Sequence, residues 1–169
     1  MLPGVPGGPG PGSSGVLYRN NLIVNGNGNL MNRGDASTCT GNFCEYGMRN
    51  NSDYALYWTT GTQSYQNFNV NYSTLPAFRT ASGGDMNSIF AAPQFVSATP
   101  MVDTDFKLQS SSPATVAGQN LVSAGYVTGP QVDYAGTTIA PGVSPSIGAY
   151  QFLYPPANGA LITAGALIH

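Results

Sequence analysis

The chain has 169 residues, which suits one domain with a sizeable core. Charged residues make up only 7% of it and hydrophobic residues 41%, so it can fold while covering its surface with neutral Asn, Ser, Thr and Gly. The net charge of −2 and five scattered cations argue against nucleic-acid binding, which needs clustered positive charge. No apolar run approaches the roughly 18 residues of a membrane span.

The chain opens with a Pro/Gly tract, residues 1–15, that lacks the basic and apolar regions of a signal peptide. If Met1 is the native start, the protein is expected to stay in the cytoplasm of its host until it is released. Gly-rich chain costs much entropy to order, and this tract has few apolar groups to repay it. The tract is either a flexible leader or an extended anchor held by a partner, and we expect the anchor, because a partner surface could order residues that an isolated domain could not hold. Its contact residues would be Met1, Leu2, Pro3, Val5, Pro6, Pro9 and Pro11.

Residues 16–152 have the sequence pattern of a β-domain. Short apolar runs such as Leu22–Val24 lie between Asn/Gly turns, and "FNVNY" alternates with period two, which is typical of a half-buried strand. One short helix is expected near Pro76–Thr80. Ser73 or Thr74 would cap it, Pro76 fits its first turn, and Gly83-Gly84 would end it.

Cys39 and Cys44 leave three alternatives open: a small disulfide loop, half of a metal site, or two reduced and partly buried thiols. A metal site is disfavoured because the chain's one histidine, His169, is its last residue. The "RGD" tripeptide at Arg33–Asp35 is interpreted as a turn.

Catalytic chemistry finds little support in the sequence. Among the acids, Asp103 and Asp105 are near neighbours that would share one face of a strand. They suggest a weak calcium pair, the paired carboxylates of a glycosidase, or a solvated turn, and the turn is favoured because calcium needs 6–8 oxygen ligands. No nucleophile–base pair is visible. We expect no catalytic residue, no metal site and no cofactor.

Five segments, taken in order, carry a family resemblance. They are "NNLIVNG", "NSDYALYW", "FNVNYSTLPAFRTASGGDMNSIFAAPQFVS", "TDFKLQSSSPATVAGQNL" and "VDYAGTTIAPGVSPSIGAYQF". This order resembles the C-terminal part of right-handed parallel β-helix proteins of the pectate-lyase-like, choice-of-anchor type. The resemblance implies an all-β fold: a short right-handed parallel β-helix or β-solenoid with a C-terminal capping region. In the cap, Phe106 and Leu108 would share one strand face, and Ile147, Ala149 and Phe152 would return to the core.

The sequence departs from the family pattern in two motifs. It has "VAG" (Val116–Gly118) where family members tend to carry "DAG", and "SIGAYQ" (Ser146–Gln151) where they carry "DIGAYE"; neutral residues in place of acids weaken any cation site there. Four aromatic residues, Tyr57, Trp58, Tyr65 and Tyr72, are candidates for stacking on sugars, with core packing as the alternative.

The tail, residues 153–169, falls outside the resemblance. Its two apolar runs, Ala160–Thr163 and Ala166–Ile168, predict short strands that pair with another chain or fold back. The partner-binding residues would be Leu161, Ile162, Leu167 and Ile168.

Two functions remain open. The first is a non-enzymatic structural protein of a virus particle, such as a bacteriophage capsid decoration or a fibre- or tail-associated module. It would be homo-oligomeric and contact other virion proteins, without nucleic acid or membrane, and its surface could take a glycan. The alternative is a fragment of a secreted or cell-surface β-helix protein that binds or cleaves carbohydrate.

Overall fold

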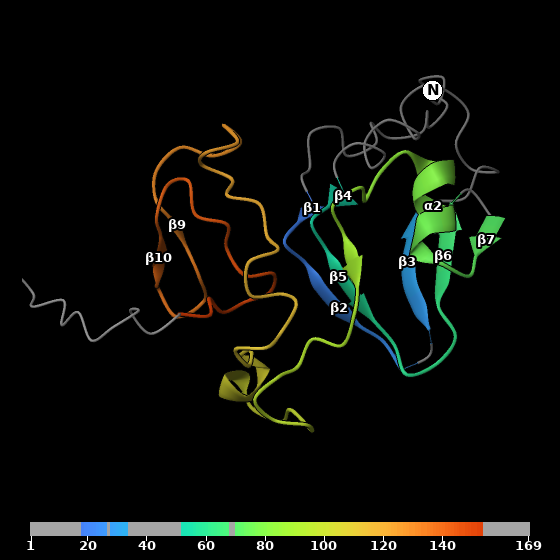
Figure 1. Cartoon of the computed structure of the whole chain (residues 1–169), viewed down its shortest axis with the longest axis horizontal. Helices are drawn as coiled ribbons and strands as arrows, with labels where there is room; N and C mark the ends of the chain where they lie inside the picture. Colours follow the sequence, from blue (N-terminus) through green and yellow to red (C-terminus); the bar gives the residue numbers. More distant parts are fainter. Residues whose placement is uncertain (1–17, 27, 34–51, 68–69, 154–169) are drawn as a thin grey trace, which may run out of the picture.

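The computed structural model describes residues 18–26, 28–33, 52–67 and 70–153. The predicted anchor at residues 1–15, the cysteine pair, the "RGD" aspartate and the apolar runs of the tail lie outside these residues. Figure 1 shows α2 and the early strands at one end and the β9–β10 hairpin at the other. The elements are β1 (Tyr18–Arg19), β2 (Leu22–Val24), β3 (Asn29–Arg33), β4 (Ser52–Asp53), β5 (Leu56–Trp58), β6 (Ser64–Asn67), β7 (Val70–Tyr72), α2 (Leu75–Ser82), β8 (Ile89–Phe90), the 3-10 helix η1 (Asp103–Phe106), β9 (Gln131–Val132) and β10 (Thr138–Ile139).

The strands form four small sheets. Three parallel pairs form between β1 and β4, between β2 and β5, and between β3 and β6. Strand β8 also pairs in parallel with β5. Strand β7 instead turns back antiparallel on β6, and β9 and β10 form an antiparallel pair. Each sheet of the described chain has two or three strands.

The predicted right-handed parallel β-helix is therefore wrong. Within the described residues no sheet closes or continues as a solenoid, and parallel and antiparallel pairs are mixed. The physical reason lies in two places. Strand β7 and then α2 end the parallel pairing beside β6, and from residue 91 onward the chain runs mainly through turns. The described residues are nevertheless β-rich and contain one α-helix.

The expected capping region also differs from its prediction. Phe106 ends η1 and is exposed, while Leu108 forms an antiparallel bridge with Phe95 and is buried. They do not share a strand face. Of the residues expected to return to the core, Ile147 is fully buried, Phe152 is half-buried and Ala149 is exposed.

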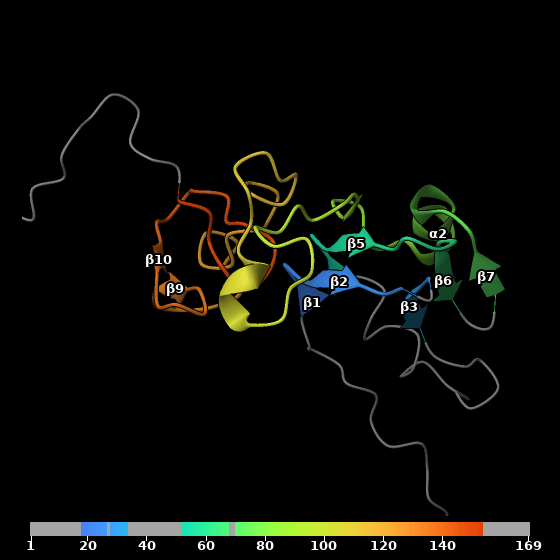
Figure 2. The same cartoon turned by 90° about the horizontal axis from the view of Figure 1, so that it is seen from below.

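The helix α2 confirms its predicted position and caps. The Thr74 side chain accepts a hydrogen bond from the Ala77 N–H, which satisfies one free donor of the first turn. Pro76 lies in that turn, and Gly83 ends the helix in the left-handed conformation with φ 68°. The buried face, with Leu75 and Phe78, packs on β6 and β7 (Figure 2).

Strand β5 separates two apolar clusters because its side chains alternate between opposite faces. Tyr57 belongs to the first cluster, with Leu30, Tyr65, Leu75 and Phe78. In this cluster the Tyr65 ring stacks on Phe78 with centroids 5.3 Å apart and meets the Tyr57 ring edge-on at 5.5 Å.

Leu56 faces the second cluster, with Leu108, Ala114 and Ile147. Those three residues come from the C-terminal part of the chain (residues 91–153). Leu56 therefore packs that part against the strands, and truncating such a buried side chain typically costs about 2–5 kcal/mol.

A buried carboxylate ties the strands to the turn that follows α2. Asp85 is fully buried, and its Oδ1 accepts hydrogen bonds from Ser52 Oγ at 3.0 Å, Tyr57 Oη at 2.9 Å and Ser88 Oγ at 2.8 Å. The backbone carbonyl of Asp85 accepts a further bond from Arg79 Nε. The Asp85 side chain thus connects β4, β5 and the entry to β8, and its backbone carbonyl adds the link to α2. These polar groups form a buried network, where each is costly unless its hydrogen bonds are complete.

We expect Asp85→Ala to destabilise the fold by about 3–5 kcal/mol, because three buried hydroxyl groups lose their acceptor. Asp85→Asn keeps the shape and one acceptor oxygen, so its loss should be clearly smaller. Urea unfolding followed by tyrosine fluorescence measures both. Equal stability of Asp85→Ala and wild type would contradict the structural role of this carboxylate.

Candidate functional site

Asn20 joins segments that lie about a hundred residues apart in the sequence. Its φ is 60°, a left-handed conformation that Asn tolerates better than most residues. The side chain exchanges two hydrogen bonds with the Gln119 backbone, at 2.7 and 2.9 Å, and the Asn20 carbonyl accepts from the Gly148 N–H at 3.0 Å. The bend between β1 and β2 therefore holds two C-terminal segments in place.

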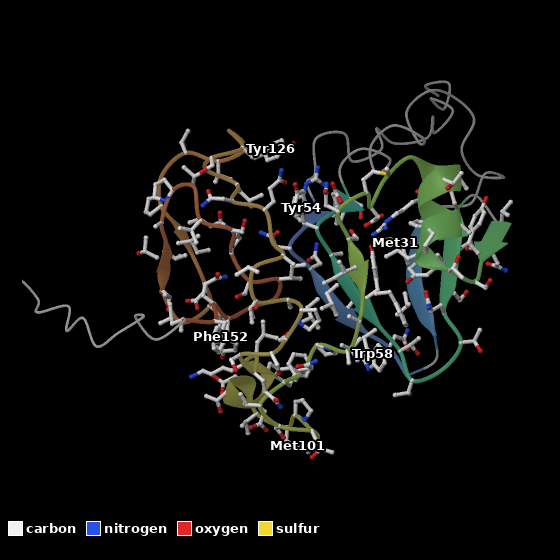
Figure 3. All side chains as sticks on the ribbon, viewed as in Figure 1. Met31, Tyr54, Trp58, Met101, Tyr126 and Phe152 are labelled. Atoms are coloured by element: carbon white, nitrogen blue, oxygen red, sulfur yellow. The ribbon has the colours of Figure 1, made fainter. Side chains whose placement is uncertain are left out.

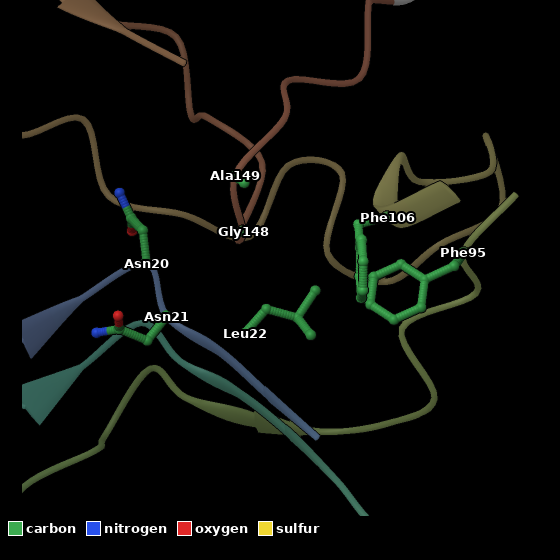
Figure 4. Close-up of a pocket in the computed structure, with 7 residues that line it drawn as sticks. All are labelled: Asn20, Asn21, Leu22, Phe95, Phe106, Gly148 and Ala149. Carbon is green, nitrogen blue, oxygen red and sulfur yellow. The ribbon is translucent and has the colours of Figure 1, made fainter. Parts of the chain in front are cut away.

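A pocket of about 390 Å³ opens beside this junction. We call it the Asn21 pocket. In Figure 4 the Leu22 side chain lies between the Asn20–Asn21 bend and the Phe95–Phe106 ring pair, with Gly148 and Ala149 beside it. Gly148 has φ 114°, and a Cβ there would lie 3.3 Å from Leu22 Cδ1, so a glycine fits the wall best. The seven lining residues are Asn20, Asn21, Leu22, Phe95, Phe106, Gly148 and Ala149, and none is charged.

The aromatic wall of the pocket is held from both sides. The Phe95 and Phe106 rings meet edge to face with centroids 5.4 Å apart. Phe95 is fixed by its bridge to Leu108 and by Gln109 Nε2, which donates to the Phe95 carbonyl at 2.7 Å. The Phe106 side chain nevertheless stays 45% exposed. An uncharged ligand with both apolar and hydroxyl groups would match this combination of ring face and amide.

Asp103 and Asp105 lie on η1 and serve the backbone. Asp105 Oδ2 accepts from the N–H groups of Met101 at 3.0 Å and Val102 at 3.3 Å, and Asp103 Oδ1 accepts from the Thr104 N–H at 2.8 Å. The pair lies on a 3-10 helix and not on one face of a strand, and both carboxylates accept from nearby backbone N–H groups. Among the described residues no group of three or more His, Cys, Asp or Glu side chains is placed to hold a metal ion.

The four aromatic candidates for sugar stacking divide into two pairs. Tyr57 and Tyr65 are fully buried, and burial by the first cluster raises the pKa of the Tyr65 hydroxyl. The prediction that Tyr57 and Tyr65 stack on a sugar is therefore wrong, because both rings are buried in the core. Trp58 and Tyr72 are half-buried and pack on Phe90 and Phe78 respectively. The structure does not bring the four residues into one open face.

A second depression, the β10 groove, crosses the C-terminal part and has a volume of about 230 Å³. Its walls come from β10 and its flanks, from the turn near Val143, from Thr115–Val116 and from Gln151–Leu153. Asp133 fixes the geometry of this region: its carboxylate accepts from the Thr137 N–H at 2.7 Å and from the Gln151 N–H at 2.9 Å.

The exposed apolar side chains are unevenly distributed. Among the described residues, all but three of the large ones lie between Val96 and Leu153. The three exceptions are Val24, Val70 and Met86. The most exposed is Met101, at 86%, which Figure 3 places at the outer end of a loop away from the strands. The strand-rich part (the described residues from Tyr18 to Phe90) thus has few exposed large apolar side chains, whereas the C-terminal part has most of them.

Comparison with protein-family models, with curated proteins and with solved structures finds no match to this chain. Within its described residues, no helix is both long and apolar enough to cross a membrane.

Sequence reasoning missed the Asn21 pocket and the β10 groove. Asn20 lies in the "NNLIVNG" segment, but nothing in that segment indicates that its partner is the Gln119 backbone. Phe95 and Phe106 lie eleven positions apart with no shared period, so only the fold shows that they form one wall.

The carboxylate of Asp133 makes the C-terminal part sensitive to acid. Burial opposes its charge, but hydrogen bonds from the backbone N–H groups of Gln151 and Thr137 outweigh that effect and hold its pKa below 3.8. We expect Asp133→Asn to lose about 1–2 kcal/mol at pH 7. The depressed pKa contributes stability that is complete above the unfolded value and is lost as pH falls through the folded one.

The difference between Asp133→Asn and wild type should therefore shrink as pH falls below 3.8. Urea unfolding at several pH values measures it. A difference that stays constant down to pH 2 would contradict the assignment.

Proposed function

We propose that this chain is a non-enzymatic structural protein of a virus particle, which binds neighbouring subunits through apolar groups presented by its C-terminal part. The observation that carries the proposal is the concentration of exposed apolar side chains between Val96 and Leu153. Apolar surface of this kind is typical of protein contacts, because burying it between subunits is favourable.

The loop at residues 96–107, the Met101 loop, is the best-defined part of this surface. Its base is closed by backbone hydrogen bonds from Val96 N to Lys107 O at 2.8 Å and from Gln109 N to Gln94 O at 2.9 Å. Asp105 holds the outer turn through the Met101 and Val102 N–H groups. A loop already ordered in this way loses little entropy on docking, so its apolar tip can contribute to affinity.

The composition supports a virion setting. A surface of neutral amide and hydroxyl groups keeps a protein soluble without the repulsion that many like charges would create in a crowded, repetitive assembly. Residues 1–15 belong to the same proposal as an extended anchor on an adjacent subunit, and many weak contacts on one symmetric particle add up through multivalency.

The Met101 loop gives the first test. We expect the double variant Met101→Asp, Val102→Asp to lower the number of copies per particle about tenfold or more. Two charges would then replace the apolar side chains that the proposed contact buries between subunits. Particles from cells infected with a virus that encodes this chain would be purified on a density gradient and the copies counted by quantitative mass spectrometry.

Val70→Asp is the matched control, because Val70 is similarly exposed, at 52%, but lies on β7 in the strand-rich part. It should leave occupancy unchanged. Deleting residues 1–15 should also lower occupancy while leaving the fold intact by circular dichroism. Particles that contain no copy of wild-type chain, or that keep full occupancy with the loop variant, would contradict the proposal.

A second candidate function is the binding of a neutral saccharide, as in the carbohydrate-binding alternative. The Asn21 pocket favours it. Phe106 presents part of its ring, Asn21 is exposed at the other end, and no lining side chain carries a charge. Aromatic faces pack on the C–H groups of sugars, and amides pair with their hydroxyls.

Saturation-transfer NMR with a panel of neutral oligosaccharides tests this candidate. We expect signal from at least one member, and Phe106→Ala should weaken its binding about tenfold or more through the lost ring contact. Val96→Ala, a truncation outside the pocket, is the control. Binding that survives Phe106→Ala would place the sugar elsewhere, and no binding by any member would count against the candidate.

A further inference from the structure

The β10 groove has the features of a site for an extended apolar segment. Three of its lining side chains are well exposed: Val116 at 57%, Val143 at 54% and Leu153 at 68%. They come from three separate stretches of chain that meet only in the fold. Ile139, which is buried, forms part of the floor.

The groove also contains a strand edge. In the described residues β10 pairs only with β9, through Thr138 to Val132 and Ile139 to Gln131. Residues 137–140 line the groove. A strand with one unpaired edge beside apolar side chains is the arrangement that accepts an added strand: backbone bonds give affinity and alternate side chains fill the pockets.

The sequence after the groove supplies a matching segment. Residues 154–169 read "YPPANGALITAGALIH", with apolar pairs at Leu161-Ile162 and Leu167-Ile168 and no Asp, Glu, Lys or Arg. The groove has no charged lining residue to repel or attract it. Of the chain's own segments, this one begins at the groove, since Leu153 is itself part of the wall.

The link between Leu153 and Ala160 favours exchange over return. It has six residues, and the sequence Pro155-Pro156 favours an extended first half, at about 3.1 Å per residue. Neither proline can donate a backbone hydrogen bond to a neighbouring strand. A return into the chain's own groove would have to reverse within the three residues Ala157–Gly159, and a short link of this kind promotes exchange between copies.

We infer that residues 160–168 of one copy bind as an added strand in the β10 groove of a second copy, beside Thr137–Ala140, with Leu161 or Ile162 against Val143. Every copy carries both the segment and the groove. Two copies that exchange segments reciprocally form a closed dimer, while one-way exchange forms a longer array. The inference uses a surface separate from the Met101 loop and does not depend on it.

Complementation between two full-length variants tests this inference. Val143→Asp spoils the groove and leaves the segment intact, and the double variant Leu161→Asp, Ile162→Asp does the reverse. By analytical ultracentrifugation we expect wild type to self-associate and each variant alone to associate about tenfold or more less tightly, because a charge enters an apolar contact. An equal mixture should recover complexes of two chains, since it contains one good groove and one good segment.

The matched controls are Val70→Asp, an exposed valine outside the groove, and Asn158→Asp, a charge in the link; both should associate as wild type does. Should Val143→Asp fail to fold by circular dichroism, Val116→Asp takes its place. Three results would each overturn the inference: wild type that is monomeric, variants that associate as tightly as wild type, or a mixture that gains nothing over its components. The Met101 loop variant should self-associate normally, so failure here and failure of the virion proposal can be told apart.

Discussion

The buried carboxylate of Asp85 is the constraint on which the strand-rich part depends. It holds three hydroxyl groups from β4, β5 and the turn before β8 at 2.8–3.0 Å, and its own φ of 58° lets the chain leave α2 toward β8. Asp53 repeats the linkage at the surface, where both oxygens accept from Asn87. Strands of two or three residues gain little from their ladders alone. Side-chain hydrogen bonds therefore hold the segments together here, as longer strand ladders do in other proteins.

The C-terminal part is also held together by side-chain hydrogen bonds, although it contains fewer helices and strands. Asn20 holds Gln119 and Gly148, and Asn120 Nδ2 donates to the carbonyls of Ala140 at 2.9 Å and Val143 at 3.0 Å. Asp133 joins its own turn to Gln151. Amide side chains suit this task because each can both donate and accept. The high Asn, Gln and Ser content, which at first indicates only a neutral surface, thus also has an internal structural role.

Local features of the fold could be predicted from the sequence, whereas its long-range pairing could not. Thr74, Pro76 and Gly83 fixed α2 because caps act within one turn of the chain. The β-helix prediction failed because motif order does not determine which way a strand such as β7 pairs. Tyr57 and Tyr65 were candidates for a surface role because alternation alone does not say which face is buried. The Asn21 pocket combines residues from Asn20 to Ala149 and the β10 groove residues from Thr115 to Leu153, and no local pattern reveals either combination.

The way this chain is held together also leaves apolar groups at its surface. Hydrogen bonds from side chains to the backbone order a loop without covering its apolar groups, so Met101 and Val143 stay exposed on fixed backbone. A long sheet would have paired the edge of β10 and buried these groups. The short hairpin instead leaves that edge and its apolar neighbours together in one groove. An ordered loop loses little entropy on docking, and the free edge of β10 can add backbone hydrogen bonds, so both features suit the proposed role in an assembly.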